Sequence, residues 1–130
     1  MSQASTQTDY IPGVCNINHA EIAYRRKAGY YGLVATLIVF GVLYTFDVNS
    51  WFRLVIFASA FVATIGFLQS KNKFCVAYGA AGTQNATDGS EVATSVTDKK
   101  AVLRDKIKAR SMNLQAVVIA AGVALFACLI

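Results

Sequence analysis

The chain has 130 residues, of which 55% are hydrophobic and 15% are charged, and it carries a net charge of +5. A soluble domain has about 25% charged residues, and a domain of this size has too much surface to bury so large an apolar share. The composition therefore argues against a soluble enzyme, a disulfide-stapled secreted domain and a disordered tail. It indicates a small all-α multi-pass membrane protein.

The N-terminal segment, residues 1–17, is interpreted as a polar, extended tail. Asn18 followed by Glu21 matches a capping box, in which Asn18 accepts from the Glu21 amide and the Glu21 side chain reaches back. Ile17 and Ile22 stand at the positions of a hydrophobic staple. A helix is therefore expected to begin directly after Asn18 and to run unbroken into the first uncharged run.

Residues 18–70 contain two apolar runs that predict transmembrane spans over about 29–46 and 51–68, and Arg53 is the one charged residue within them. Eighteen residues of helix rise roughly 27 Å, close to the thickness of a bilayer core. The link between the runs is so short that the two helices must form an antiparallel hairpin. Arg53, in the first turn of the second span, is expected to snorkel outward beside Trp51.

Residues 71–112 are interpreted as a long loop, and residues 113–130 as a third span. Residues 79–97 are rich in Gly, Ala, Ser and Thr, which is typical of flexible loop. Residues 98–110 predict a basic amphipathic helix, which re-aims the chain into the third span or docks on lipid or a partner. Its basic residues are Lys99, Lys100, Arg104, Lys106, Lys108 and Arg110.

The Lys and Arg residues are distributed unevenly about these spans. Three precede the first span, eight lie in the 2–3 loop, and Arg53 alone lies near the 1–2 link. The positive-inside rule then places the N-terminus and the long loop in the cytoplasm and the C-terminus outside a bacterial-type inner membrane. Attraction to anionic lipid explains the basic surplus, so no nucleic-acid partner is inferred. A signal peptide fits the first span poorly, because no small-residue cleavage site follows it.

Two cysteines form the one candidate chemical site. Cys15 and Cys75 are predicted on the cytoplasmic face at the two legs of the hairpin, beside basic residues that lower thiol pKa values. They are either inert structural thiols or a working thiol pair, and a lasting disulfide is not expected in a reducing compartment. Cys128 is expected to behave as a small apolar residue. The lone histidine, His19, is assigned a local role.

No enzyme motif is found in the sequence. It has no nucleophile elbow, no phosphate-binding loop and no metal-spaced cluster of His and acidic residues. We therefore expect no catalytic residues, no metal site and no bound cofactor.

Small residues recur at helical spacing along the spans, which lets helix backbones approach closely. They are interpreted as helix-packing positions. These positions are Gly32, Ser59, Ala63, Gly66, Ala116, Ala120 and Ala124.

The hairpin region, about residues 15–82, resembles the YgaP-like inner-membrane two-helix domain. The matching residues are Asn16, Glu21, Arg25-Arg26-x-x-Gly29 and Phe74-Cys75-x-x-Tyr78-x-x-x-Gly82, with Val76 where the family commonly has proline. The resemblance implies a membrane hairpin that can associate as a dimer. Some family members are fused to a rhodanese sulfurtransferase, but this sequence has no such domain, so sulfur transfer does not carry over.

Three functions are compatible with these features. The first is a non-catalytic accessory subunit of a larger membrane complex, such as an electron-transfer or photosynthetic assembly, in contact with lipid and other integral membrane subunits. The second is a thiol-dependent protein that handles sulfur or senses redox state through Cys15 and Cys75. The third is a scaffold that associates with itself. The first is favoured because the spans lack ionisable residues at membrane depth.

Overall fold

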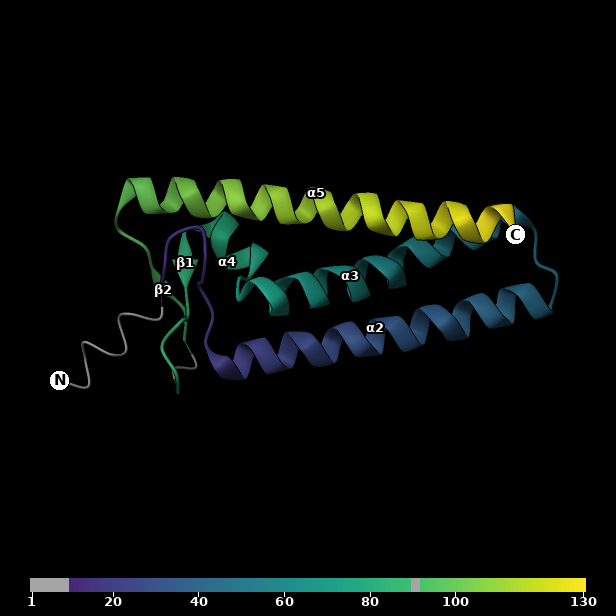
Figure 1. Cartoon of the computed structure of the whole chain (residues 1–130), viewed down its shortest axis with the longest axis horizontal. Helices are drawn as coiled ribbons and strands as arrows, with labels where there is room; N and C mark the ends of the chain where they lie inside the picture. The colour runs from purple at the N-terminus through teal and green to yellow at the C-terminus, as the bar shows by residue number, and fades with distance from the viewer. Residues whose placement is uncertain (1–9, 90–91) are drawn as a thin grey trace.

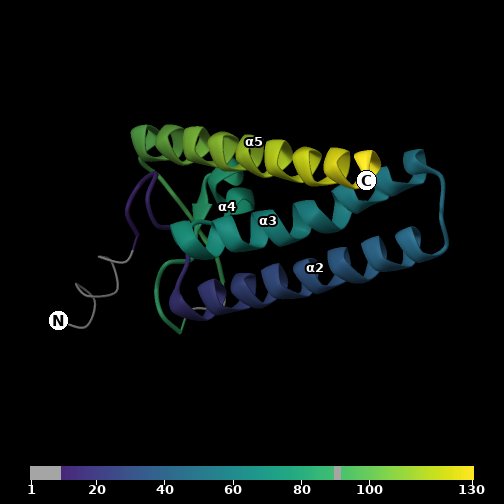
Figure 2. The ribbon, with the colours of Figure 1, turned by 45° about the vertical axis from the view of Figure 1, so that its right-hand side comes forward.

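The computed structural model describes residues 10–89 and 92–130, and three long helices dominate it (Figure 1). They are α2 (His19–Thr45), α3 (Ile56–Asn72) and α5 (Lys99–Leu129). In two views α3 lies between α2 and α5 (Figures 1 and 2). Counting the 3-10 helix η1 (Ser50–Val55) with α3, all three are long and apolar enough to cross a membrane, which confirms the predicted number of such helices.

Helix α2 begins where the sequence predicts. The Asn18 side chain accepts a hydrogen bond from the Glu21 amide at 3.0 Å, so it caps the helix. Ile17 and Ile22 lie in one buried cluster, as a hydrophobic staple requires. The helix then continues without a break through Gly29 into the apolar run.

The contact between α2 and α3 is a backbone contact made through glycines. A Cβ atom on Gly32 would lie 2.5 Å from the Ala63 nitrogen, and one on Gly66 would lie 2.7 Å from the Gly29 nitrogen. Neither position can carry a side chain unless the helices move apart. Glycine at these points therefore sets the spacing of the hairpin.

Helix α5 packs on α3 through a buried stripe of small residues. Ala116, Ala120 and Ala124 are all buried, and Ala120 shares a core cluster with Ala60. Ser59 is half-buried and its hydroxyl donates to the Ile56 carbonyl within the same helix. The buried stripe of α3 therefore passes through Ala60 rather than through Ser59.

The expected helix over residues 98–110 is not a separate element. It is the first part of α5, which continues into the third span with no break. The residues between, Ser111-Met112-Asn113, include no glycine or proline to end a helix. With 31 residues, α5 is about 46 Å long, so it extends well beyond a bilayer core.

The segment between α3 and α5 is more ordered than the flexible loop that its composition predicts. Lys73 adopts φ 55° and ends α3, and the short helix α4 (Val76–Ala81) follows. Gly82, at φ 75°, leads into β1 (Thr83–Gln84), which pairs antiparallel with β2 (Thr94–Ser95).

The predicted tail is wrong over residues 10–17, which fold against the helices. Ile11 and Cys15 form an isolated bridge, and Ile17 pairs with Asn85 beside β1. These residues make long-range hydrogen bonds that a polar composition does not reveal. The rest of the predicted tail, residues 1–9, lies outside the described residues.

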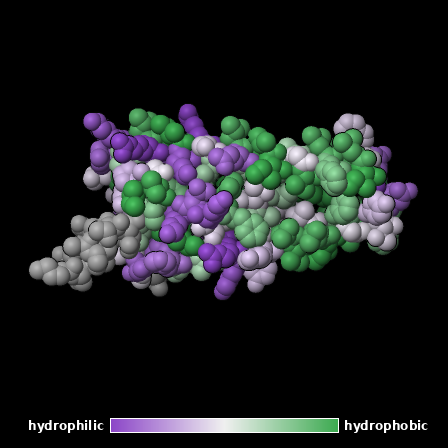
Figure 3. Space-filling model, viewed as in Figure 1, coloured by the Kyte–Doolittle hydropathy of each residue, from purple (hydrophilic) through white to green (hydrophobic). Residues whose placement is uncertain are grey.

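The surface divides into two regions (Figure 3). Hydrophilic side chains gather at the end that holds α4 and the strands, and apolar side chains cover much of the helices beyond it. Large apolar residues remain exposed on α2 and α5. They include Leu33, Leu37 and Ile38 on α2, and Val118, Leu125 and Phe126 on α5.

Candidate functional site

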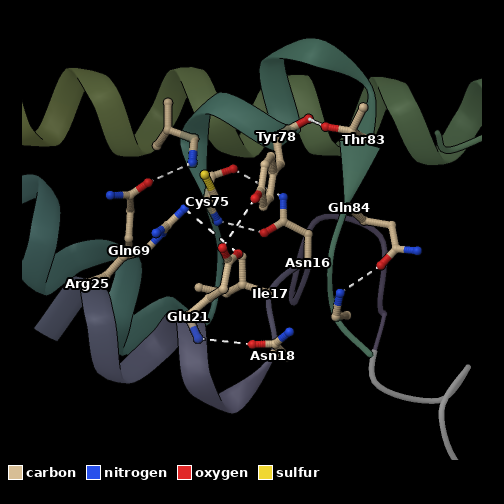
Figure 4. A network of polar contacts seen from close by, with 12 residues as sticks. Asn16, Ile17, Asn18, Glu21, Arg25, Gln69, Cys75, Tyr78, Thr83 and Gln84 are labelled. Atoms are coloured by element: carbon tan, nitrogen blue, oxygen red, sulfur yellow. Dashed lines mark hydrogen bonds and ion pairs between the residues drawn. The ribbon is translucent and has the colours of Figure 1, made fainter. Parts of the chain in front are cut away.

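The candidate site is the polar end of the molecule, which we call the polar cap. It comprises residues 10–26, α4 with its flanking turns and strands, and the first part of α5, residues 99–110 (Figure 1). Most of the sequence-predicted site residues outside the packing stripes lie here. Figure 4 shows its central network of polar contacts.

Asn16 joins three segments of the cap. Its side chain accepts from the Cys75 amide at 2.6 Å and donates to the Cys75 carbonyl at 3.1 Å (Figure 4). Its own amide donates to the Lys73 carbonyl, and its carbonyl accepts from the Asn85 amide. Asn16 is fully buried, so each of these bonds satisfies a group that water cannot reach. The contact with Cys75 uses the backbone of that residue and not its thiol.

Tyr78 connects α4 to α2. Its hydroxyl donates to the Glu21 carboxylate at 3.2 Å (Figure 4). Arg25 lies 4.0 Å from the other Glu21 oxygen, and its guanidinium lies 5.9 Å from the centre of the Tyr78 ring. Burial, together with the Glu21 charge, raises the pKa of Tyr78, so the phenol remains a neutral donor. Glu21 therefore serves this contact as well as pairing with Arg25.

Val76 uses a donor that proline would lack. Its amide donates to the Gln69 side chain at 3.0 Å, across the turn between α3 and α4 (Figure 4). The YgaP-like motif commonly has proline at this position, the first residue of α4. Proline suits that position but has no N–H. The Val76 amide thus provides a hydrogen bond that holds α4 to the end of α3.

Asp105 is the functional residue that sequence reasoning missed. It lies within the basic segment of α5, yet it has no exposed surface. Its two oxygens accept from the Tyr10 hydroxyl and from the Gly13 amide, both at 2.7 Å. Burial and the bond to Asp105 raise the pKa of Tyr10. The sequence does contain a signal, because Asp105 stands four residues from both Ala101 and Ala109, two small residues that share its helix face.

Cys15 and Cys75 occupy different surroundings. Cys15 is half-buried and lines an open hollow of about 270 Å³ with His19, Lys73 and Asp88. Cys75 is buried in the cluster of Ile17 and Ile22. All three cysteines of the chain are thiols.

His19 and Asp88 form a pair at the rim of this hollow. The His19 ring nitrogen Nδ1 lies 2.9 Å from the carboxylate, and the His19 amide donates to it at 3.1 Å. These hydrogen bonds, the one from the amide first, lower the pKa of Asp88. Both side chains are mostly exposed. The pair links the start of α2 to the turn after β1.

Most of the predicted docking residues are exposed on the first part of α5. Lys99, Lys100, Arg104, Lys106 and Arg110 face outward. Lys108 is half-buried, and its ammonium donates to the Asn72 side chain at 3.1 Å. Lys108 therefore helps to hold α5 against the end of α3.

At the opposite end of the molecule, the prediction for Arg53 is wrong. Only 6% of Arg53 is exposed, and its guanidinium donates to the Ala127 carbonyl at 3.4 Å and lies 5.7 Å from the centre of the Tyr44 ring. The last carbonyls of a helix have no intrahelical donor and carry partial negative charge, which favours a cation. Arg53 therefore turns inward and joins α2, η1 and α5. Cys128 also does more than fill space, because its thiol donates to the Ser50 carbonyl.

Comparison of the chain with protein-family models, curated proteins and solved structures finds no match. The similarity to the YgaP-like hairpin therefore stays a prediction. Within residues 10–89 and 92–130, no group of three or more His, Cys, Asp or Glu side chains is placed to hold a metal ion. The hydrogen bonds of the polar cap join segments that are distant in the sequence.

Proposed function

We propose that the chain is a non-catalytic accessory subunit of a larger membrane assembly. One observation carries this proposal: the buried and half-buried polar groups of the cap are used to join segments of the chain. Asn16 binds Cys75, Glu21 binds Tyr78, and Asp105 binds Tyr10 and Gly13. Side chains engaged in this way build a rigid unit instead of presenting reactive groups to a substrate.

The outer helices offer the surfaces that a subunit requires. α2 and α5 flank α3 and keep large apolar side chains exposed, among them Leu37 at 62% and Phe126 at 65%. Such faces suit contact with lipid and with neighbouring integral membrane subunits. Gly122 and Ala35 add open, small-residue positions on these two faces.

The proposed orientation follows from the distribution of charge. The polar cap carries the basic residues of the N-terminal segment and of α5, whereas the opposite end carries Arg53. We propose that the cap lies in the cytoplasm, next to a bacterial-type inner membrane, and that the α2–η1 turn and the C-terminal end of α5 lie outside.

The proposal is tested by gentle extraction of native membranes, native gel separation and mass spectrometry of the band that contains this chain. Co-migration with larger integral subunits is expected. Trp substitutions at Ala35 and Gly122 then identify the outer face involved, because the bulky ring blocks close contact there without entering the core. Migration of the wild-type chain alone would contradict the proposal, and migration as a small oligomer of itself would favour the scaffold instead.

A second candidate, the thiol-dependent function, is favoured by one observation. Cys15 lines a hollow together with Lys73 and His19, which favour a thiolate when they are charged. Alkylation rates distinguish this candidate. A working Cys15 should react with iodoacetamide faster than Cys128 at pH 7, and Lys73→Gln should slow it. Equal rates for the two cysteines would exclude an activated thiol.

A further inference from the structure

A second hollow, of about 390 Å³, lies between the start of α2 and the end of α3. It is lined by Arg26 and Tyr30 from α2 and by Phe67, Ser70 and Lys71 from α3. It is distinct from the hollow at Cys15, and none of its five residues belongs to the polar contacts of Asn16, Glu21 or Asp105.

The lining residues are ordered by depth along both helices. On α2, Arg26 precedes Tyr30 by one turn, and on α3, which runs the opposite way, Lys71 follows Phe67 by one turn. Each helix thus contributes a cation on the side of the polar cap and an aromatic ring on the side of the span. The rings meet edge to face, with centres 5.0 Å apart. Both cations stand just outside the apolar runs that are expected to cross the membrane.

The Arg26 guanidinium is oriented by the protein. Its Nε donates to the Ser70 hydroxyl at 3.3 Å, and Ser70 is buried. This bond uses one of the five N–H donors of arginine, and the planar fork can still bind two phosphate oxygens. Among the described residues, the ion pairs join His19 to Asp88 and Arg25 to Glu21, so neither includes Arg26 or Lys71.

We propose that this hollow binds the phosphate of an anionic phospholipid, and we call it the headgroup site. Arg26 and Lys71 contact the phosphate, and the glycerol and upper acyl chain lie along Tyr30 and Phe67. Cations at headgroup depth above aromatic rings match the chemistry of a lipid at the membrane interface. A free phosphate ion would use the cations but would gain nothing from the two rings. The inference rests on insertion of the spans in a membrane and not on the subunit role.

The test is native mass spectrometry of the full-length chain in detergent, titrated with phosphatidylglycerol. Arg26→Gln and Lys71→Gln should each weaken lipid binding about fivefold, the effect of one cation near an anionic headgroup. Lys27→Gln is the matched control, because Lys27 is exposed beside Arg26 and does not line the hollow. It should change the affinity by less than about twofold. Tyr30→Ala should also weaken binding, because it removes half of the aromatic surface.

Three results would overturn the headgroup site. Equal losses in Lys27→Gln and Arg26→Gln would indicate diffuse surface attraction. Displacement of the lipid by equimolar inorganic phosphate would indicate a site for free phosphate. Unchanged affinity in Tyr30→Ala would exclude the acyl contact. If Arg26→Gln does not fold, Arg26→Lys replaces it, since it keeps the charge and loses the fork; it should bind more weakly than wild type.

Discussion

In the polar cap, segments far apart in the chain are joined by hydrogen bonds from buried side chains, whereas the spans meet through small residues with little polar contact. Asn16 reaches Cys75, and Tyr10 reaches Asp105 across most of the sequence. In the spans, Gly32 lies against Ala63, and Ala120 packs in the cluster that contains Ala60. The two regions therefore fail in different ways when they are altered.

This difference follows from the solvent that each region faces. Apolar side chains gain little by leaving lipid for a helix interface, so close backbone approach has to hold the spans together. In the proposed topology the cap lies in water, where a buried polar group that loses its partner is costly. Substitutions that add volume should therefore damage the spans most, and those that remove a hydrogen-bonding group should damage the cap most.

The largest effect is expected for Gly32→Leu. The new Cβ would lie 2.5 Å from the Ala63 backbone, so α2 and α3 would have to separate, at a cost of about 4 kcal/mol. Gly41→Leu is the control, because a Cβ there meets nothing within 4 Å. Stability is measured by SDS titration in mixed micelles, followed by far-UV circular dichroism. Equal stability of the two variants would contradict the close helix contact.

Asp105→Ala should be next in effect. It removes a buried carboxylate that accepts two hydrogen bonds and should cost about 2 to 3 kcal/mol. The Gly13 amide, which donates to Asp105, should exchange its hydrogen much faster, and exchange mass spectrometry of a peptide that includes residues 10–18 measures this. Asp98→Ala is the control: it removes the exposed side chain that caps the N-terminus of α5, and it should leave hydrogen exchange in that peptide unchanged. Unaltered protection in Asp105→Ala would refute the role of the carboxylate.

Asn16→Ala should cost about 2 kcal/mol, because it leaves the buried amide of Cys75 without an acceptor, whereas the Cys75 carbonyl keeps its bond from the Gly79 amide. Cys75→Ala leaves both backbone groups in place and should cost about 1 kcal/mol or less. The same SDS titration compares the two variants. A larger loss in Cys75→Ala than in Asn16→Ala would contradict the assignment of this contact to the Cys75 backbone.

The smallest effect is expected from the raised pKa of Tyr10. Below pH 10 the phenol is neutral in both states, so its contribution to stability is fully present. As the pH rises above 10, the unfolded state loses the proton first, and stability falls. Tyr10→Phe should therefore lose less stability than wild type between pH 9 and pH 11. An equal loss in both proteins would show that burial and the bond to Asp105 do not raise the pKa of Tyr10.

The three apolar helices and the start of α2 were predictable from local signals. Apolar runs mark the spans, and Asn18 with Glu21 marks the cap of α2. Asp105 was hidden because its partners Tyr10 and Gly13 lie more than 90 residues away, and no local pattern encodes such a pairing. The prediction that Arg53 points outward is wrong because its inward orientation depends on the Ala127 carbonyl near the end of α5. No local pattern around Arg53 shows that this carbonyl lies beside it.

Other contacts of the polar cap also join residues that are far apart in the sequence, so no local pattern predicts them. Asn16 and Cys75 are noted in the sequence only as separate residues of one motif, and it is the fold that brings them together. Residues 79–97 have the composition of a loop, yet pairing of Thr83 with Ser95 orders two short strands there. The sequence does not connect Arg26 with Lys71, because their common hollow exists only when α2 and α3 lie side by side.

The central claim is the proposed division of the chain between a cytoplasmic polar cap and three spans. The direct test is cysteine labelling in intact cells, in a variant whose three native cysteines are replaced by alanine. A single cysteine then replaces either Asn49, in the α2–η1 turn, or Asp88, in the polar cap. The cells are treated with a membrane-impermeant maleimide. The account predicts labelling at position 49 in intact cells and at position 88 only after permeabilisation. Labelling of position 88 in intact cells would contradict it.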